Sequence, residues 1–184
     1  IVMTSKDCIT GTDRIAEAAQ KIKADIYINV QGDEPMLSPD MIDVAIKPLM
    51  TRSDVKGTIL SMDIIHETQY YNPDVLKIIH DLDNRILYTS RSPIPYAKRF
   101  SAALGAKRIY GIFGFKWRFL KTFISLPESP LEIKEACDSN RLYDNGFHQY
   151  IAPYPFTSGF SVDSPEDIAL VEEHMLKDAL WGKY

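Results

Sequence analysis

Apolar residues recur at helical spacing over residues 12–23 and again over residues 39–49. A hydroxyl-bearing residue precedes each segment and can cap a helix there. Between the two segments, residues 25–30 are rich in β-branched and aromatic side chains and end at a polar loop. The pattern therefore predicts a helix, a buried strand and a second helix, in that order.

The middle of the chain is rich in strand patterns. Strands are expected at residues 57–65, 75–80, 85–88 and 108–115. The Asp-Leu-Asp-Asn run at residues 81–84 is typical of a hairpin turn between two of them. We expect an antiparallel insertion between about residues 56 and 110.

The last third of the chain alternates helix and strand again. The Ser-Pro-Leu-Glu run at residues 129–132 is a capping-box pattern and predicts a helix that Gly146 closes. A short β-like segment follows, and the Asp-Ser-Pro-Glu-Asp run at residues 163–167 opens a final helix. The order predicts an α/β fold, with a mixed, mainly parallel sheet flanked by helices and interrupted by the antiparallel insertion.

We expect one domain over residues 1–184, because the chain of 184 residues, 45% of them hydrophobic, can bury one core. Its opening Ile-Val-Met resembles the end of a buried strand, so the domain is expected to be truncated at its N-terminus. The net charge is −4, and the cations are spread among acids without a basic stripe, so nucleic acid is not expected as a partner.

Neither a membrane partner nor a disulfide framework is expected. No apolar run approaches the roughly 20 residues that span a bilayer. The two cysteines, Cys8 and Cys137, have no paired spacing, so a reducing, cytoplasmic location fits.

The Gln-Gly-Asp-Glu-Pro loop at residues 31–35 lies beyond the end of the first predicted strand, where open α/β sheets bind ligands. A carboxylate such as Asp33 suits Mg²⁺, and Asp163 ends a second extended segment before a helix. Two such carboxylates can hold Mg²⁺ with a nucleotide. A solvent-facing loop for Asp33 and a capping role for Asp163 are the alternatives, and the pattern leaves them open.

Two arginines are candidates for anion binding. Arg91 follows a strand and precedes a proline-stiffened loop, so its guanidinium can meet a carboxylate or phosphate, with a surface arginine as the alternative. Arg14 lies in the first turn of a helix, whose free N–H groups suit an anion. The histidines have no metal-ligand spacing, and Ser90 and Ser92 have no base partner for covalent hydrolase chemistry. The aromatic run that includes Phe115 is assigned to core or pocket wall.

Four blocks, in this order, resemble the 3-deoxy-manno-octulosonate (KDO) cytidylyltransferase family. Thr-Gly-Thr-Asp-Arg at residues 10–14 and Asn-Val-Gln-Gly-Asp-Glu-Pro at residues 29–35 look like the nucleotide-binding core of that family. Tyr-Thr-Ser-Arg-Ser-Pro-Ile-Pro-Tyr at residues 88–96 is similar to its Tyr-Phe-Ser-Arg-(Ala/Ser)-X-Ile-Pro block. Val-Asp-Ser-Pro-Glu-Asp at residues 162–167 is similar to its Val-Asp-Thr-Pro-Glu-Asp block. The resemblance runs over almost the whole chain.

The resemblance implies a nucleotide-diphosphosugar-transferase-like fold, usually dimeric. It implies an enzyme that converts CTP and a 3-deoxy-2-ulosonic acid sugar into a CMP-sugar and pyrophosphate. Asp33 and Asp163 would carry the Mg²⁺ cofactor, and Gly11, Thr12 and Arg14 would line the cytidine site. The metal would draw charge from the α-phosphate while the anomeric hydroxyl of the sugar attacks it in line.

The resemblance also implies the residues of the substrate site. Asp33 and Arg91 are the expected catalytic residues, and Gln31 would touch the nucleotide or the sugar. The expected substrate contacts are Gln31, Arg91, Phe115, Glu135 and Asp138. The expected partners are CTP, an acidic sugar and a second copy of the chain in a homodimer.

The sequence departs from the family in two places. The family opens with a strand and a phosphate-gripping loop of the Leu-Pro-Gly-Lys-Pro-Leu type that this chain lacks, so the chain alone is expected to be inactive. Its His-X-Gly-Ile-Tyr-Gly-Tyr block is Ile-Tyr-Gly-Ile-Phe-Gly-Phe at residues 109–115, and its Glu-Gln-Leu-Arg block is Asp-Ser-Asn-Arg at residues 138–141. Because hydrogen-bond partners for sugar hydroxyls are lost, specificity should move away from KDO itself.

Two other functions stay open. A CMP-sialic-acid-type synthetase shares the chemistry and would be separated by a panel of sugars. A non-catalytic relative would bind CTP without releasing pyrophosphate. The glycan that receives the product, whether lipopolysaccharide, capsule or another, is not fixed by the sequence.

Overall fold

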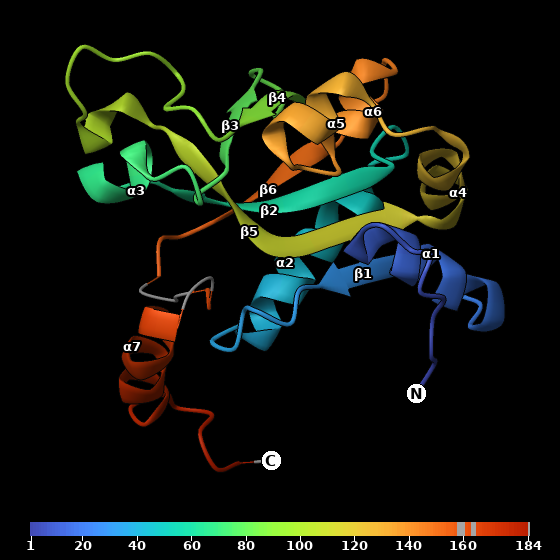
Figure 1. Ribbon diagram of the computed structural model, residues 1–184, viewed down its shortest axis with the longest axis horizontal. Helices are drawn as coiled ribbons and strands as arrows, with labels where there is room; N and C mark the ends of the chain where they lie inside the picture. Colours follow the sequence, from blue (N-terminus) through green and yellow to red (C-terminus); the bar gives the residue numbers. More distant parts are fainter. Residues whose placement is uncertain (158–160, 163–164, 184) are drawn as a thin grey trace.

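The computed structural model describes residues 1–157, 161–162 and 165–183 (Figure 1). The strands are β1 (Ile26–Val30), β2 (Gly57–Asp63), β3 (Lys77–His80), β4 (Ile86–Ser90), β5 (Lys107–Lys116) and β6 (Tyr150–Tyr154). The helices are α1 (Gly11–Lys21), α2 (Pro39–Thr51), α3 (Glu67–Tyr71), α4 (Trp117–Ser125), α5 (Pro130–Glu135), α6 (Asn140–Asp144) and α7 (Pro165–Met175), with a 3₁₀ turn at Ala102–Leu104. None of the described helices has the length and apolar character that a membrane span requires.

Strand β5 organises the sheet. The strand order is β4-β3-β5-β2-β6, and β1 also pairs with β5. β1 pairs with residues 112–116 of β5 and β3 pairs with residues 107–108, while β2 pairs with both of these stretches. β1 and β3 therefore share one edge of β5, and residues 109–111 lie in the gap between the end of β1 and the start of β3.

Helices cover both faces of the sheet (Figure 1). Neighbouring strand residues point to opposite faces, so Ile59 and Phe113 join the core beneath α1, α4 and α6. Leu60 and Ile112 join the core beneath α2. The apolar runs of the central strands are explained by burial on both faces.

The sheet is mixed and flanked by helices, as predicted, but its pairing in the described part of the chain is not mainly parallel. β2 and β6 pair in parallel, whereas the β1–β5, β2–β5, β3–β5 and β3–β4 ladders are antiparallel. The alternation of helices and strands along the chain suggested a parallel sheet, but antiparallel strands covered by helices on both faces can follow one another in the same order. The expected insertion is therefore part of the central sheet.

The helix predicted from residue 129 to Gly146 is wrong in one respect, because it forms as two helices. Its capping box is present at Ser129 and Glu132, but Ala136 adopts a left-handed conformation with φ of +45° and ends α5. Arg141 of α6 then donates hydrogen bonds of 2.8 and 2.5 Å to the Glu132 carboxylate. A buried ion pair thus joins the two short helices.

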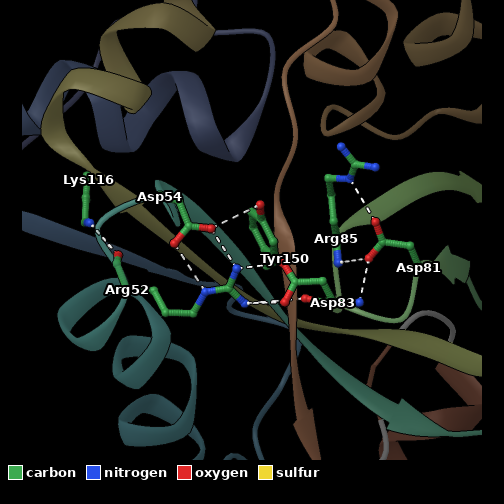
Figure 2. Close-up of polar contacts among 7 residues, drawn as sticks. All are labelled: Arg52, Asp54, Asp81, Asp83, Arg85, Lys116 and Tyr150. Carbon is green, nitrogen blue, oxygen red and sulfur yellow. Dashed lines mark hydrogen bonds and ion pairs between the residues drawn. The ribbon is translucent and has the colours of Figure 1, made fainter.

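The hairpin between β3 and β4 forms as predicted, and its turn is tied to the end of α2 (Figure 2). Arg52, which caps α2, contacts Asp54 at 2.6 Å and Asp83 at 2.7 Å. The Arg52 guanidinium also lies 4.8 Å from the centre of the Tyr150 ring. Within the turn, Asp81 Oδ1 accepts the N–H of Asp83 at 2.9 Å.

Candidate functional site

A cleft lies beside β5, in the gap between the end of β1 and the start of β3. It contains two adjoining hollows, which we call the polar cavity (about 400 Å³) and the second cavity (about 520 Å³). Both are lined by Gln31, Leu76, Ile109 and Ala136. The cleft therefore lies beyond the carboxyl end of β1, where the sequence predicted a ligand site.

The loop after β1 is fixed against Gly111 of β5. The N–H of Gln31 donates to the Gly111 carbonyl at 2.9 Å, and the N–H of Gly111 donates to Glu34 Oε1 at 3.1 Å. A Cβ at position 111 would lie 2.8 Å from both Gln31 Oε1 and Glu34 Cγ. Only glycine lets the loop approach the strand this closely.

Asp33 is exposed on this loop and lines the polar cavity. Its backbone carbonyl accepts a hydrogen bond of 2.8 Å from the N–H of Val162, and Ser161 Oγ donates to Glu34 Oε1 at 2.9 Å. The segment at residues 161–162 is therefore bonded to the loop that carries Asp33. Asp163, the second predicted metal ligand, directly follows this segment and lies outside the described residues.

Buried groups under the polar cavity were not identified from the sequence. Glu34 is 8% exposed and Arg108 6%, and Tyr110 is fully buried. Burial raises the pKa of Glu34, and burial together with the Glu34 carboxylate raises the pKa of Tyr110. Glu34 Oε2 has no hydrogen-bond partner among the described residues. The acidic loop motif was a signal for Glu34, whereas no sequence spacing pointed to Arg108.

The guanidinium of Arg91 is held by backbone oxygens at the wall of the polar cavity. Nε donates to the Glu135 carbonyl at 2.9 Å, Nη1 to the Pro73 carbonyl at 2.9 Å and Nη2 to the Ala136 carbonyl at 3.3 Å. No carboxylate among the described residues forms an ion pair with it. Its positive charge is therefore available to an anionic ligand.

The carboxylate of Glu135 faces the Tyr88 and Ser90 side chains of β4 and lines neither cavity. It accepts hydrogen bonds from the Tyr88 hydroxyl (2.5 Å), the Ser90 hydroxyl (2.8 Å) and the Arg91 N–H (2.8 Å). Burial opposes its ionisation, but these hydrogen bonds outweigh burial and lower the pKa of Glu135. Glu135 thus holds the segment that carries Arg91.

The second cavity brings together Gly11, Gln31 and Asp138. Thr12 lies next to Gly11 at the start of α1, and its hydroxyl donates a hydrogen bond of 2.6 Å to Asp138 Oδ2. Burial raises the pKa of Asp138, an effect that the Thr12 hydrogen bond opposes. Three of the four predicted nucleotide-site residues therefore lie in or beside this cavity.

Arg14 and Phe115 lie away from the cleft. Arg14 donates to Thr4 Oγ1 and to the carbonyls of Ser5 and Cys8, so it holds the segment before α1. Phe115 is 1% exposed within the core beneath α1 and α4, where it packs against Phe119. We therefore correct the assignment of Phe115 from a substrate contact to a core residue, because its strand position points the ring inward.

Three kinds of comparison place this chain among known proteins, namely a family model, curated relatives and a solved structure. The family model described as "Cytidylyltransferase" matches residues 1–151. The chain belongs to the cytidylyltransferase family. This result confirms the family and the enzyme class that the sequence motifs predicted.

This cytidylyltransferase is 36% identical to the 3-deoxy-manno-octulosonate cytidylyltransferase of Syntrophotalea carbinolica, over 95% of this chain and 73% of the relative. It is 37% identical to the enzyme of the same name from Acidobacterium capsulatum, over 96% of this chain and 71% of the relative. A solved structure of CMP:2-keto-3-deoxy-manno-octonic acid synthetase complexed with CTP matches with a TM-score of 0.86 and 31% identity. That match covers 96% of this chain and 72% of the synthetase.

Three of the positions at which the motifs differ from those of the resembled family lie together in this cytidylyltransferase. Ile109, Phe113 and Asp138 all line the second cavity. Two of these side chains are apolar and the third is an acid bonded to Thr12. Thr10, Glu128 and Glu132 also line this cavity, so its wall combines apolar and acidic side chains.

Proposed function

We propose that this cytidylyltransferase transfers CMP from CTP to a 3-deoxy-2-ulosonic acid sugar, KDO or a close analogue, and releases pyrophosphate. Asp33, Gln31 and Arg91 all line the polar cavity, and this arrangement is the main support for the proposal. Gln31 and Asp33 lie on the loop after β1, whereas Arg91 follows β4, 60 positions after Gln31 in the sequence (91 − 31). The names of the relatives support the proposed acceptor.

We propose Mg²⁺ as the cofactor, held by Asp33 and Asp163. Carboxylate oxygens are suitable ligands for Mg²⁺, and Asp33 is exposed in a cavity that is also lined by Glu34, whose Oε2 has no hydrogen-bond partner in the described part of the chain. The donor set therefore fits the ion, although no three His, Cys, Asp or Glu side chains in the described part of the chain cluster tightly enough to form a complete protein site. Mg²⁺ when bound neutralises charge on the phosphate oxygens.

The protein residues bind and orient the substrates. Arg91 meets an anionic oxygen of the sugar or the nucleotide, and Gln31 lies where the two cavities join, within reach of either substrate. The sugar hydroxyl forms a bond to the α-phosphorus of CTP, the bond to the pyrophosphate oxygen breaks, and the hydroxyl proton passes to solvent. Positioning of this kind lowers the barrier without a protein nucleophile.

The second cavity supports an acceptor that differs from KDO. The side chains of Ile109 and Phe113 offer no hydrogen bond to a sugar hydroxyl. The carboxylate of Asp138 already accepts a hydrogen bond from Thr12. A site that lacks a partner for a hydroxyl discriminates poorly in favour of that hydroxyl. We therefore propose that the enzyme accepts both KDO and analogues of KDO that are altered at one hydroxyl.

The experiment is a substrate panel with the full natural chain, CTP and Mg²⁺. KDO, amino-KDO and sialic acids are offered in turn, and the CMP-sugar is identified by mass spectrometry. A CMP-ulosonate product supports the proposal, whereas product from a nine-carbon acid alone supports the sialic-acid-type alternative. CTP binding without product from any sugar would contradict the proposal.

The homodimer and the cytoplasmic location remain predictions. A homodimer is tested by sedimentation equilibrium of the full natural chain, and a cytoplasmic location by fractionation of cells that express it. A monomer at micromolar concentration, or enrichment in the membrane fraction, would contradict them.

A further inference from the structure

Lys77, the first residue of β3, is completely buried, which is uncommon for a lysine. Its Nζ donates hydrogen bonds to the backbone oxygens of Asn72 at 2.6 Å and Arg91 at 2.7 Å. Burying a cation costs free energy, and methionine would fill nearly the same space without that cost. The role of the buried ammonium group therefore depends on the chain segments that it holds in place.

Lys77 joins the two chain segments that position Arg91. Asn72 directly precedes Pro73, whose carbonyl accepts the hydrogen bond of 2.9 Å from Arg91 Nη1. The other oxygen bonded to Lys77 is the carbonyl of Arg91 itself. One ammonium group thus fixes both the backbone of Arg91 and the loop that holds its guanidinium.

Lys107 of the neighbouring strand β5 differs from Lys77 in its exposure and in its partner. It is partly exposed, and its Nζ contacts Asp63 at 2.6 Å. Its one described side-chain partner, Asp63, lies on β2 and not on the segments that hold Arg91. Burial, with the charge of Arg91 as the next cause, lowers the pKa of Lys77 to about 8, so Lys77 still carries its proton at neutral pH.

We infer that Lys77 is a positioning residue of this cytidylyltransferase, which orients Arg91 toward an anionic oxygen of a substrate. That oxygen belongs either to the carboxylate of the acid sugar or to a phosphate of CTP. The inference rests on the proposed function, because it takes Arg91 as a substrate-binding group. Lys77 itself touches no substrate and acts through Arg91.

A double-mutant cycle tests this role in the full natural chain. The variants are Lys77→Met, Arg91→Ala and the combination of both, with Lys107→Met as the matched control. The KM values for CTP and for the sugar are measured separately by pyrophosphate release. The substrate whose KM changes carries the oxygen that Arg91 meets.

Lys77→Met is expected to raise one KM about tenfold, the scale of one lost hydrogen bond to a charged group. In the Arg91→Ala background it should change that KM less than about twofold, because residues that act as a unit are not additive. Lys107→Met should leave both KM values unchanged. An equal factor in both backgrounds, or no change of KM in Lys77→Met, would overturn the inference.

A wild-type protein that releases no pyrophosphate with any acid sugar contradicts the proposed function and not the positioning role. Lys77 is then tested by NMR, through the exchange of the Arg91 Nε–H that is bonded to the Glu135 carbonyl. The positioning role predicts that Lys77→Met speeds this exchange about tenfold, while Lys107→Met does not. Unchanged exchange in Lys77→Met would overturn it.

Discussion

The backbone N–H of Gly111 donates a hydrogen bond to Glu34 Oε1 at 3.1 Å, and the glycine leaves no room for a side chain above it. This contact holds the loop that carries Asp33 against the central strand. The position of Asp33 on its loop therefore depends on a glycine of β5, 78 residues later in the chain (111 − 33).

Gly111→Ala should destabilise the protein by about 1–3 kcal/mol, because the added methyl group collides with Gln31 and Glu34. Urea unfolding measures the change. Gly32→Ala is the matched control, since a Cβ at position 32 has no atom within 4 Å. Equal stability of the two variants would show that the loop moves away from β5 without cost.

Asp138→Asn should change how stability depends on pH. The pKa of Asp138 is raised above 3.8 in the folded protein, so the stability from this group is present below pH 3.8 and lost as the pH rises through the folded pKa. Within that window, unfolding of the wild type releases up to about one proton from Asp138, and unfolding of the variant releases none.

Urea unfolding of both proteins across this pH window measures the effect. Glu34, whose pKa is also raised, is present in both proteins and cancels in the comparison. Asn keeps an oxygen that accepts from Thr12, so the hydrogen bond is retained. Identical pH slopes for the two proteins would contradict the raised pKa of Asp138.

Arg52→Ala should lower the melting temperature by a few degrees at most, because the contacts of Arg52 with Asp54 and Asp83 are exposed (Figure 2). The difference should shrink at high salt, which screens surface charges. Lys177→Ala removes a single exposed pair with Glu173 and serves as the control. A salt-independent difference for Arg52→Ala would assign its role to the Tyr150 contact.

The sequence predicted the elements that depend on local chemistry. Thr10 accepts the N–H of Asp13, and the carboxylate of Asp13 accepts the N–H of Thr10, so α1 begins as the capping pattern indicated. The resemblance to the family implied that Asp33 and Arg91 act at one site, and both line the polar cavity. The direction of strand pairing was not predictable in this way, because burial on both faces gives parallel and antiparallel strands the same composition.

The contacts that hold the site residues in place were harder to predict from the sequence. Lys77 lies in an apolar strand pattern, and its partners are backbone oxygens, which leave no trace in side-chain spacing. Glu135 was predicted as a substrate contact, but its carboxylate binds β4 because α5 ends there. Phe115 was assigned to the pocket, although the packing of α4 on the strand places it in the core.

The polar cavity is tested as the active site by pyrophosphate release from CTP and a 3-deoxy-2-ulosonic acid, with the full natural chain and its Asp33→Asn variant. We expect release by the wild type and a loss of at least about a hundredfold in kcat for the variant, with the fold intact by circular dichroism. Wild-type activity retained in Asp33→Asn would contradict the assignment of the polar cavity as the active site.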